Sequence, residues 1–469
     1  MSLFSKLASG VPLRARSLSF TVAALVAAGA LSPAVQAADD ASLAQLRQQI
    51  DDLRQQYEGR LKALEARVQA AEAQARSAPT PTGSTAAAAQ PTAQTAAARA
   101  RDNRFNPAVA LVLSGTYAHL SKDPDSWGMA GFVTGDDEIG PGDKGLSLGE
   151  SELTLSANID PWWFGQLTFA LTPDNEAEVE EAFVQTTALS NGLTVKAGRF
   201  LSGVGYQNSQ HAHTWDFVDA PLAYQAFLGG QLKHDGVQAT WVLPTDTFVQ
   251  LGAEVARGAA SHNGAGASAV FAQVGGDVGV SHSWRLGLSH LWARPVDREW
   301  VATDLSDNEA LNSFSGKSRT LVLDGVWKWA PEGNAQSTNF KLQGEYFRRT
   351  DRGDVTYDVG GEGELADAYK ATQSGWYLQG VYQFMPTWRV GLRHDQLDSG
   401  SVDYGLNNAS LDRADTRPQR TSMMVDWAPS EFSRWRLQLS RDRARADETD
   451  NQVYLQYQMN LGAHGAHSF

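Results

Sequence analysis

The sequence predicts an all-β fold, a transmembrane antiparallel β-barrel of about sixteen strands, preceded by an α-helical coiled-coil stalk. Three observations support this prediction: segments that alternate between apolar and polar residues, connections that alternate between short and long, and tryptophans beside the short connections. The barrel is expected over residues 105–469. A signal peptide (1–37), a periplasmic coiled coil (38–78) and a flexible linker (79–104) are expected before it.

The first residues have the features of a secretory signal peptide. Lys6, Arg14 and Arg16 precede an apolar run over residues 20–31, and residues 35–37 form a small-residue cleavage site. The run is shorter than the roughly 18 residues that a membrane-spanning helix requires. We therefore expect export, with cleavage after residue 37.

Composition narrows the class of protein further. The chain has no cysteine and a formal net charge of -14, so no disulfide framework is available and nucleic-acid binding is disfavoured. No long apolar run follows the signal peptide, which excludes a helical membrane protein. No nucleophile elbow or phosphate-binding loop is recognisable, so neither an enzyme nor a cofactor is predicted.

The segment after the cleavage site has the heptad spacing of a coiled coil. The apolar positions follow one another in steps of three and four, at Leu43, Leu46, Ile50, Leu53, Tyr57, Leu61, Leu64, Val68 and Ala71. A helix that lies against a domain surface is the alternative left open. A homotrimer is expected only because trimeric barrels commonly carry such stalks. Residues 79–100 contain no apolar side chain larger than alanine and read as a linker.

Sixteen period-two segments follow, and the second of them shows the pattern plainly. Leu153 and Leu155 alternate with Glu152 and Thr154, so one face can meet lipid and the other water. Short connections, expected on the periplasmic side, alternate with long ones, expected outside. The long connections are predicted over residues 121–144, 203–229, 296–317, 352–373 and 398–418. Nine tryptophans near the short connections predict one interfacial girdle, and Phe469 ends the last segment with the parity of its apolar face.

Two short segments, residues 179–184 (VEEAFV) and residues 193–200 (LTVKAGRF), precede the long connection 203–229, and the second leads directly into it. Together with the signal peptide and the stalk, they resemble the phosphate-selective and related porins of Gram-negative outer membranes. It implies a sixteen-stranded trimeric porin whose third long loop folds inward to narrow the pore. It does not imply the substrate.

Strand parity predicts which charged side chains face the lumen. The predicted pore-lining residues are Lys341, Arg389, Arg393, Arg420 and Arg436 on one wall, Glu150 and Glu152 on the other, and Asp216 and Asp219 on the constriction loop. Glu181 and Glu254 point inward by the same rule. Walls of opposite charge would set a transverse field across the pore; the alternative is that these groups only form salt bridges with one another.

The expected external loops are acidic. Residues 121–144, 296–317, 351–373 and 395–417 hold 22 acids and 8 bases, a difference equal to the formal net charge of -14. Such a mouth concentrates cations and repels anions, which predicts a cation bias. Acidic loops that bind divalent ions between lipopolysaccharide molecules are the alternative explanation.

A pair of histidines in the third long loop suggests a metal site. His211 and His213 are two residues apart, so an extended backbone presents both on one side, with Asp216 and Asp219 nearby. Zinc or copper could bind there transiently. Two solvated loop histidines are the simpler alternative.

The sequence thus predicts passive diffusion of small hydrophilic solutes or ions across the Gram-negative outer membrane. The expected partners are outer-membrane lipid and lipopolysaccharide, the transported solutes and further copies of the chain, with the stalk in the periplasm. A metal-binding or substrate-specific uptake barrel that uses the loop around His211 and His213 is the alternative function.

Overall fold

The computed structural model describes residues 107–133, 139–149, 151–171, 177–257, 266–306, 308–413 and 415–462. The predicted signal peptide, coiled coil and linker lie outside the described residues, as does the C-terminal Phe469.

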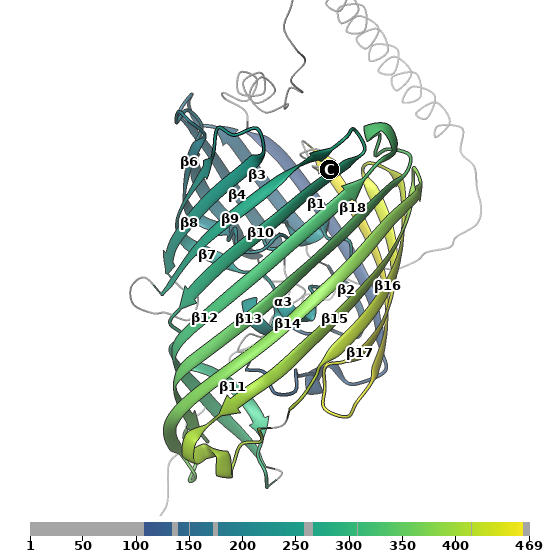
Figure 1. Ribbon diagram of the computed structural model, residues 1–469. Coiled ribbons are helices and arrows are strands. Elements are labelled where there is room, and N and C mark those ends of the chain that lie inside the picture. The colour runs from purple at the N-terminus through teal and green to yellow at the C-terminus, as the bar shows by residue number, and fades with distance from the viewer. Residues whose placement is uncertain are drawn as a thin grey trace, which may run out of the picture. The chain divides into compact units, whose positions relative to one another are not determined.

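The described strands form one antiparallel sheet that closes on itself, because β1 pairs with β18 on one side and with β2 and β3 on the other (Figure 1). The strands are β1 (Ala108–Leu120), β2 (Gly145–Leu148), β3 (Ser151–Asn158), β4 (Trp163–Leu171), β5 (Ala177–Thr186), β6 (Leu193–Leu201), β7 (Lys233–Val242), β8 (Phe248–Arg257), β9 (Ala267–Val278), β10 (His282–Ala293), β11 (Arg298–Thr303), β12 (Glu309–Trp329), β13 (Asn339–Tyr357), β14 (Leu365–Met385), β15 (Trp388–Asp403), β16 (Gln419–Ser430), β17 (Ser433–Arg443) and β18 (Asp450–Gly462).

Two of the wall strands are interrupted. β2 and β3 pair with successive parts of β1, and β10 and β11 pair with successive parts of β12. The 18 labelled strands therefore make sixteen wall strands in the described part of the chain. This agrees with the predicted number of period-two segments.

Side chains alternate between the two faces of the wall as strand geometry requires. On β12, Leu323 and Trp327 are exposed on the outer face, whereas Val322 and Val326 are buried inside. Exposed apolar side chains recur on the outer face of neighbouring strands, for example Leu342 on β13 and Leu378 on β14. A closed barrel with a continuous apolar exterior is the form in which strands cross a membrane.

The predicted tryptophan girdle lies on the outer face. Trp388 of β15 stacks on Trp427 of β16, with ring centroids 6.0 Å apart, and Trp435 of β17 meets Tyr457 of β18 at 4.6 Å. The girdle positions at least partly exposed are Trp162, Trp163, Trp241, Trp284, Trp327, Trp329, Trp388, Trp427 and Trp435. They mark the membrane interface at the end of the barrel with the short connections.

The predicted bounds of the long connections 296–317 and 352–373 are wrong, because strands occupy much of them. β12, β13 and β14 run for 21, 19 and 21 residues. Beyond the apolar band their outward positions are mostly polar, so the alternation of apolar and polar residues ends although the strands remain paired. Inside the barrel, these extended parts pack around a hydrophobic cluster that contains Phe314, Val355 and Tyr369.

The helices of the described residues are short. They are the 3₁₀ turns η1 (Pro124–Ser126), η2 (Ala212–Thr214), η3 (Pro331–Gly333) and η4 (Gly405–Ala409) and the α-helix α3 (Leu222–Leu228). Among the described residues, no helix combines the length and the apolarity needed to cross a membrane.

The orientation of β12 can be tested by placing a charge on its outer face. Leu323→Arg should destabilise the inserted barrel by about 2–4 kcal/mol, because the side chain would lie in hydrocarbon. Leu311→Arg, on the same face of the same strand but beyond the apolar band, should cost at most about 1 kcal/mol. Equilibrium unfolding in lipid vesicles measures both, and equal losses would contradict the proposed membrane position.

Candidate functional site

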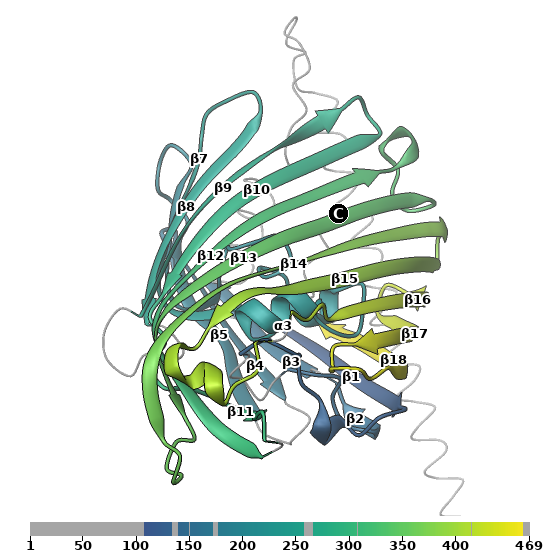
Figure 2. The ribbon, with the colours of Figure 1, turned by 60° about the horizontal axis from the view of Figure 1, so that its bottom comes forward.

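The connection between β6 and β7, residues 202–232, runs into the barrel. Figures 1 and 2 show its helix α3 enclosed by the strands, and all seven residues of α3 are buried. Phe227 stacks on Phe347 of β13 with ring centroids 5.9 Å apart, and Tyr224 meets Phe347 edge-on at 5.2 Å. The inward fold of this loop, which the resemblance implied, is therefore present.

Local sequence explains where α3 begins and ends. Pro221 precedes it, and the fixed φ of proline suits a helix start. Gly229 ends it with a φ of 65°, in the left-handed region that favours glycine. The residues between them have no charged face, because α3 is buried on all sides.

Asp219, in the second half of this loop, is held by the basic wall. Its carboxylate lies 2.8 Å from Nη2 of Arg393 on β15 and 2.7 Å from Nη1 of Arg420 on β16. Gln438 of β17 donates a further hydrogen bond at 2.8 Å. Burial alone would raise the pKa of Asp219, but the two guanidinium charges and these hydrogen bonds outweigh it and lower the pKa to about 2.

Asp216, three residues before Asp219, is also held by basic side chains of the wall. It pairs with Nζ of Lys341 at 2.5 Å and with Nη1 of Arg389 at 3.2 Å, and it accepts a hydrogen bond from Gln379 at 3.0 Å. Burial opposes the charged form, yet Lys341 and Arg389 keep the pKa of Asp216 below its ordinary value. Arg389 also pairs with Asp426, so the loop joins an existing network of wall charges.

Arginines of the wall also bind main-chain carbonyl oxygens of the loop. A buried carbonyl without a donor would be costly, and a charged donor forms a strong hydrogen bond to it. The pairs are Arg436 to Trp215 O at 2.6 Å, Arg420 to Ala220 O at 2.5 Å, Arg349 to Ala226 O at 3.0 Å and Arg393 to Asp219 O at 2.8 Å. The basic wall therefore holds the loop by both its side chains and its backbone.

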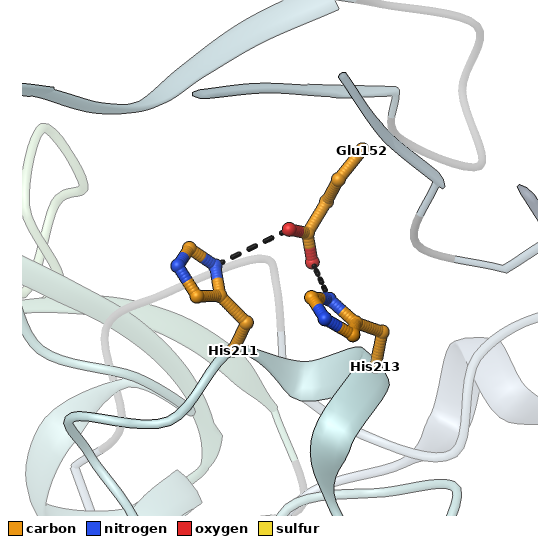
Figure 3. A group of neighbouring side chains, drawn as sticks. All are labelled: Glu152, His211 and His213. Atoms are coloured by element: carbon orange, nitrogen blue, oxygen red, sulfur yellow. Dashed lines mark hydrogen bonds and ion pairs between the residues drawn. The ribbon is translucent and has the colours of Figure 1, made fainter. Parts of the chain in front are cut away.

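The first half of the loop meets an acidic wall. Figure 3 shows Glu152 between the two histidines: its carboxylate lies 2.6 Å from Nδ1 of His213 and 3.2 Å from Nδ1 of His211. Glu180 lies 2.9 Å from Nδ1 of His211, and Glu181 lies 3.1 Å from its Nε2. Both ring nitrogens of His211 thus face carboxylates, as in a protonated imidazole that donates from each nitrogen.

The surroundings of His211 favour its charged form. Burial would lower its pKa, but hydrogen bonds to Glu152, Glu180 and Glu181 place the pKa well above its ordinary value. One oxygen of the buried Glu180 carboxylate, Oε1, has no hydrogen-bond partner among the described residues. Three glutamates thus face two histidines, so the cluster holds more carboxylates than imidazoles to pair with them.

Two further glutamates fix the entry of the loop into the lumen. Glu254 accepts hydrogen bonds from Oγ of Ser202 at 2.6 Å and from the amide of Gly203 at 2.7 Å. Glu345 accepts from the amides of residues 206–207, at 3.1 and 3.0 Å. Glu345 was not among the residues predicted from the sequence. Its inward parity on β13 was the available signal.

The predicted lumen residues fall into two groups in the structure. Arg393, Arg420 and Arg436 face the lumen, but each is only 1% exposed because the loop covers it, so they contact the loop where an open passage was expected. Lys341 and Arg389 are 20% and 28% exposed. Of the others, Glu152, Asp216 and His213 are buried and Asp219 and His211 are partly exposed, whereas Glu150 lies outside the described residues.

A second set of basic side chains faces the lumen near the short connections. These partly exposed positions are Lys196, Arg285, Lys328, Lys341, Arg389 and Arg434. Lys328 of β12 lies directly opposite Lys341 of β13 in the sheet register. Lys196, Arg285, Lys328 and Arg434 were not predicted as site residues, although the same parity rule points each of them inward.

The ion pairs of Asp219 can be tested with Asp219→Asn. Leaving Arg393 and Arg420 buried without this carboxylate should cost about 3–5 kcal/mol at pH 7 and release the loop. Because the pKa is lowered, the stabilisation exists above the ordinary pKa of about 3.9 and disappears as the pH falls towards about 2. The variant should lack this pH-dependent part.

Limited proteolysis within residues 202–232, recorded between pH 7 and pH 2.5, measures that release. Asp246→Asn, an exposed acid in a short connection, is the matched control and should behave as the unaltered protein. Equal cleavage of the loop in all three proteins at pH 7 would contradict the anchoring role of Asp219.

Comparisons with known proteins find similar solved structures and one protein of similar sequence. The structure is similar to OmpT of Vibrio cholerae, an outer membrane protein (10% identical, 76% of this chain, 97% of that chain, TM-score 0.47). It is also similar to the outer membrane channel DcaP of Acinetobacter baumannii (13%, 76%, 97%, TM-score 0.45) and to an anion-selective porin from Comamonas acidovorans (12%, 76%, 99%, TM-score 0.47).

No family model matches the chain. An uncharacterized protein of Aquifex aeolicus (strain VF5) is 31% identical over 348 residues, which cover 70% of this chain and 70% of that protein. The chain therefore belongs to the same family as this Aquifex aeolicus protein.

Proposed function

We propose that the protein is an outer-membrane porin, through which small hydrophilic solutes or ions diffuse along their concentration gradient. The observation that carries this proposal is a closed barrel whose inner wall is polar and whose loop 202–232 is anchored inside the lumen. Barrels of sixteen strands are wide enough to hold an aqueous channel. A loop fixed to the wall narrows such a channel to a defined cross-section.

The proposed location is the outer membrane of a Gram-negative bacterium. The signal peptide predicted over residues 1–37 supports export, and the apolar outer face of the barrel supports insertion into a bilayer. In the proposed assembly, residues 38–78 form a coiled-coil stalk in the periplasm and three copies associate. Outer-membrane lipid and lipopolysaccharide then surround the barrel.

Two charged regions would act on a permeating ion in opposite directions. The acidic outer loops attract cations, which supports the proposed cation bias, whereas the partly exposed lysines and arginines of the lumen attract anions. Two of the acids counted in the loops, Asp351 and Asp395, are instead buried inner-wall residues that pair with Arg349 and Arg393. The cation bias is therefore set by the remaining loop acids and opposed inside the lumen.

Lys328→Gln tests this opposition, because it removes a lumen cation that faces Lys341. Cation preference should increase at 0.1 M salt and the effect should shrink at 1 M, as the Debye length falls from about 10 Å to about 3 Å. Reversal potentials of single channels in planar bilayers measure it. Arg441→Gln, on the outer face of β17, is the control and should leave the potential unchanged. A Lys328 variant indistinguishable from this control would place Lys328 outside the conducting path.

A metal-dependent function is a second candidate, favoured by one observation. Donor atoms of Glu152, His211 and His213 lie within 4.8 Å of one another, inside the lumen. Two imidazoles and a carboxylate are a ligand set that suits zinc, because this ion binds both histidine nitrogen and carboxylate oxygen. A divalent cation would also offset the buried negative charge that Glu180 and Glu181 add. In this form of the proposal, the loop binds a transition-metal ion on its path through the barrel.

Zinc titration tests this second function. Micromolar zinc should reduce single-channel conductance, and the block should strengthen from pH 7.5 to pH 9 and fade towards pH 5.5. Zinc must displace the proton that the surrounding carboxylates favour on His211, whose pKa they raise well above its ordinary value. The double variant His211→Ala/His213→Ala should remove the block. His119→Ala, an exposed outward histidine of β1, should retain it. A block that persists in the double variant would place the zinc elsewhere.

A further inference from the structure

A groove on the outer face of the barrel is lined by basic side chains. It has a volume of about 970 Å³ and lies over β10, β12 and β13, which are neighbours in the sheet and side by side in Figure 1. Its basic residues are Arg294, Lys317, Arg319, Arg348 and Arg352. Those on β12 and β13 occupy outward positions, on the same face as Leu323 and Trp327, so the groove faces away from the lumen.

The positive charge of this groove is not balanced by its own lining. One acid, Asp354, accompanies the five basic residues. None of the five takes part in an ion pair within the part of the chain that the structure describes. This differs from the lumen arginines Arg393, Arg420 and Arg436, each of which pairs with a carboxylate. The groove therefore has an excess of positive charge that could bind an anion from outside the chain.

The sheet register brings like charges together beside the groove. Lys317 of β12 lies opposite Arg352 of β13, and Arg352 lies opposite Lys370 of β14. All three side chains are exposed on the outer face. Like charges in directly opposed positions destabilise a sheet. Lys370 has a carboxylate opposite it on its other side, Asp403 of β15, so the pair without compensation is Lys317 and Arg352. An anion bound between these two would offset their repulsion.

The height of the groove on the barrel identifies the source of the anion. Arg319 is eight residues beyond Trp327 of the girdle on β12. At about 3.4 Å per residue and a tilt of about 45°, this places Arg319 roughly 19 Å above the girdle, near the far edge of an apolar band about 25 Å tall. Exposed Trp292 lies opposite Arg319, and apolar Leu321 lines the lower edge of the groove. Headgroups of the outer leaflet lie at this level.

We propose that this groove binds the phosphate groups of a phosphorylated glycolipid of the outer leaflet, the class to which lipopolysaccharide belongs. Guanidinium groups such as those of Arg319, Arg348 and Arg352 hold phosphate oxygens by paired hydrogen bonds. An acyl chain of the same lipid can follow Leu321 and Leu323 down the apolar face. The inference rests on the proposed outer-membrane location, not on conduction through the lumen.

The test uses the triple variant Arg319→Gln/Arg348→Gln/Arg352→Gln of the full chain, delipidated in detergent. The matched control is Arg441→Gln/Arg443→Gln, which removes two outward cations of β17 outside the groove. The probes are purified lipopolysaccharide with intact lipid A phosphates, the same material after enzymatic dephosphorylation, and inorganic phosphate. Affinity is measured by titration, and bound lipid is counted by native mass spectrometry.

Lipopolysaccharide should bind the triple variant on the order of 100-fold more weakly than the unaltered protein, at about fivefold per surface charge. The control should keep its affinity, and dephosphorylated material should bind both proteins weakly. Undiminished binding by the triple variant, or equal binding of dephosphorylated lipopolysaccharide, would overturn the proposal. Displacement of the lipid by micromolar inorganic phosphate would assign the groove to free anions and overturn it as well.

Conductance recorded on the same preparations separates this inference from the proposed channel. The triple variant should conduct like the unaltered protein, since the changed residues face away from the lumen. Absence of conduction in the unaltered protein would count against the channel, while specific binding of lipopolysaccharide in the same sample would still support the groove.

Discussion

Asp219 and the two arginines that face it determine where loop 202–232 can lie inside the barrel. Burying three charges is costly, and the cost is recovered only when the carboxylate and both guanidinium groups meet. Moving the loop out of the lumen would remove Asp219 and leave Arg393 and Arg420 with only the wall carboxylates Asp395 and Asp442 near them. The pairing therefore links the position of one segment to strands that follow it by more than 150 residues in the sequence.

The loop also separates the two walls by charge. Glutamates of β3 and β5 hold its histidines, while arginines of β15, β16 and β17 hold its aspartates and carbonyl groups. Most of this charge is neutralised where it is buried, which favours salt bridges over a transverse field for those residues. Only the partly exposed lumen cations, such as Arg389 and Lys341, remain placed to act on a solute.

Period-two alternation was sufficient to predict the strand number and the inward face of the wall residues Lys341, Arg389, Arg393, Arg420 and Arg436, because side chains alternate along a regular paired strand. It fails on β5, where an irregular register lets the consecutive Glu180 and Glu181 both reach His211. The same rule could not predict that Arg393 would be covered, since burial there depends on a loop distant in sequence. Nor could it predict that β12, β13 and β14 continue beyond the apolar band. Their outward residues there are polar, so the alternation of apolar and polar residues ends, although the strands still pair through backbone hydrogen bonds. Glu345 was missed for a related reason, because its partners are backbone amides of the loop and the hydroxyl groups of Tyr224 and Tyr377, which are far from it in sequence or on another strand.

The anchoring of loop 202–232 limits which parts of this barrel can be exchanged. The tip between β13 and β14 is satisfied largely by its own residues: Glu364 accepts from the amide of Gly360, and Asp358 accepts from that of Gly363. Such a tip can carry an inserted peptide with little cost to the wall. Loop 202–232 cannot be grafted alone into another scaffold, because its conformation depends on contacts with the surrounding strands. A transplanted loop would also need the arginines and glutamates of the wall that hold it.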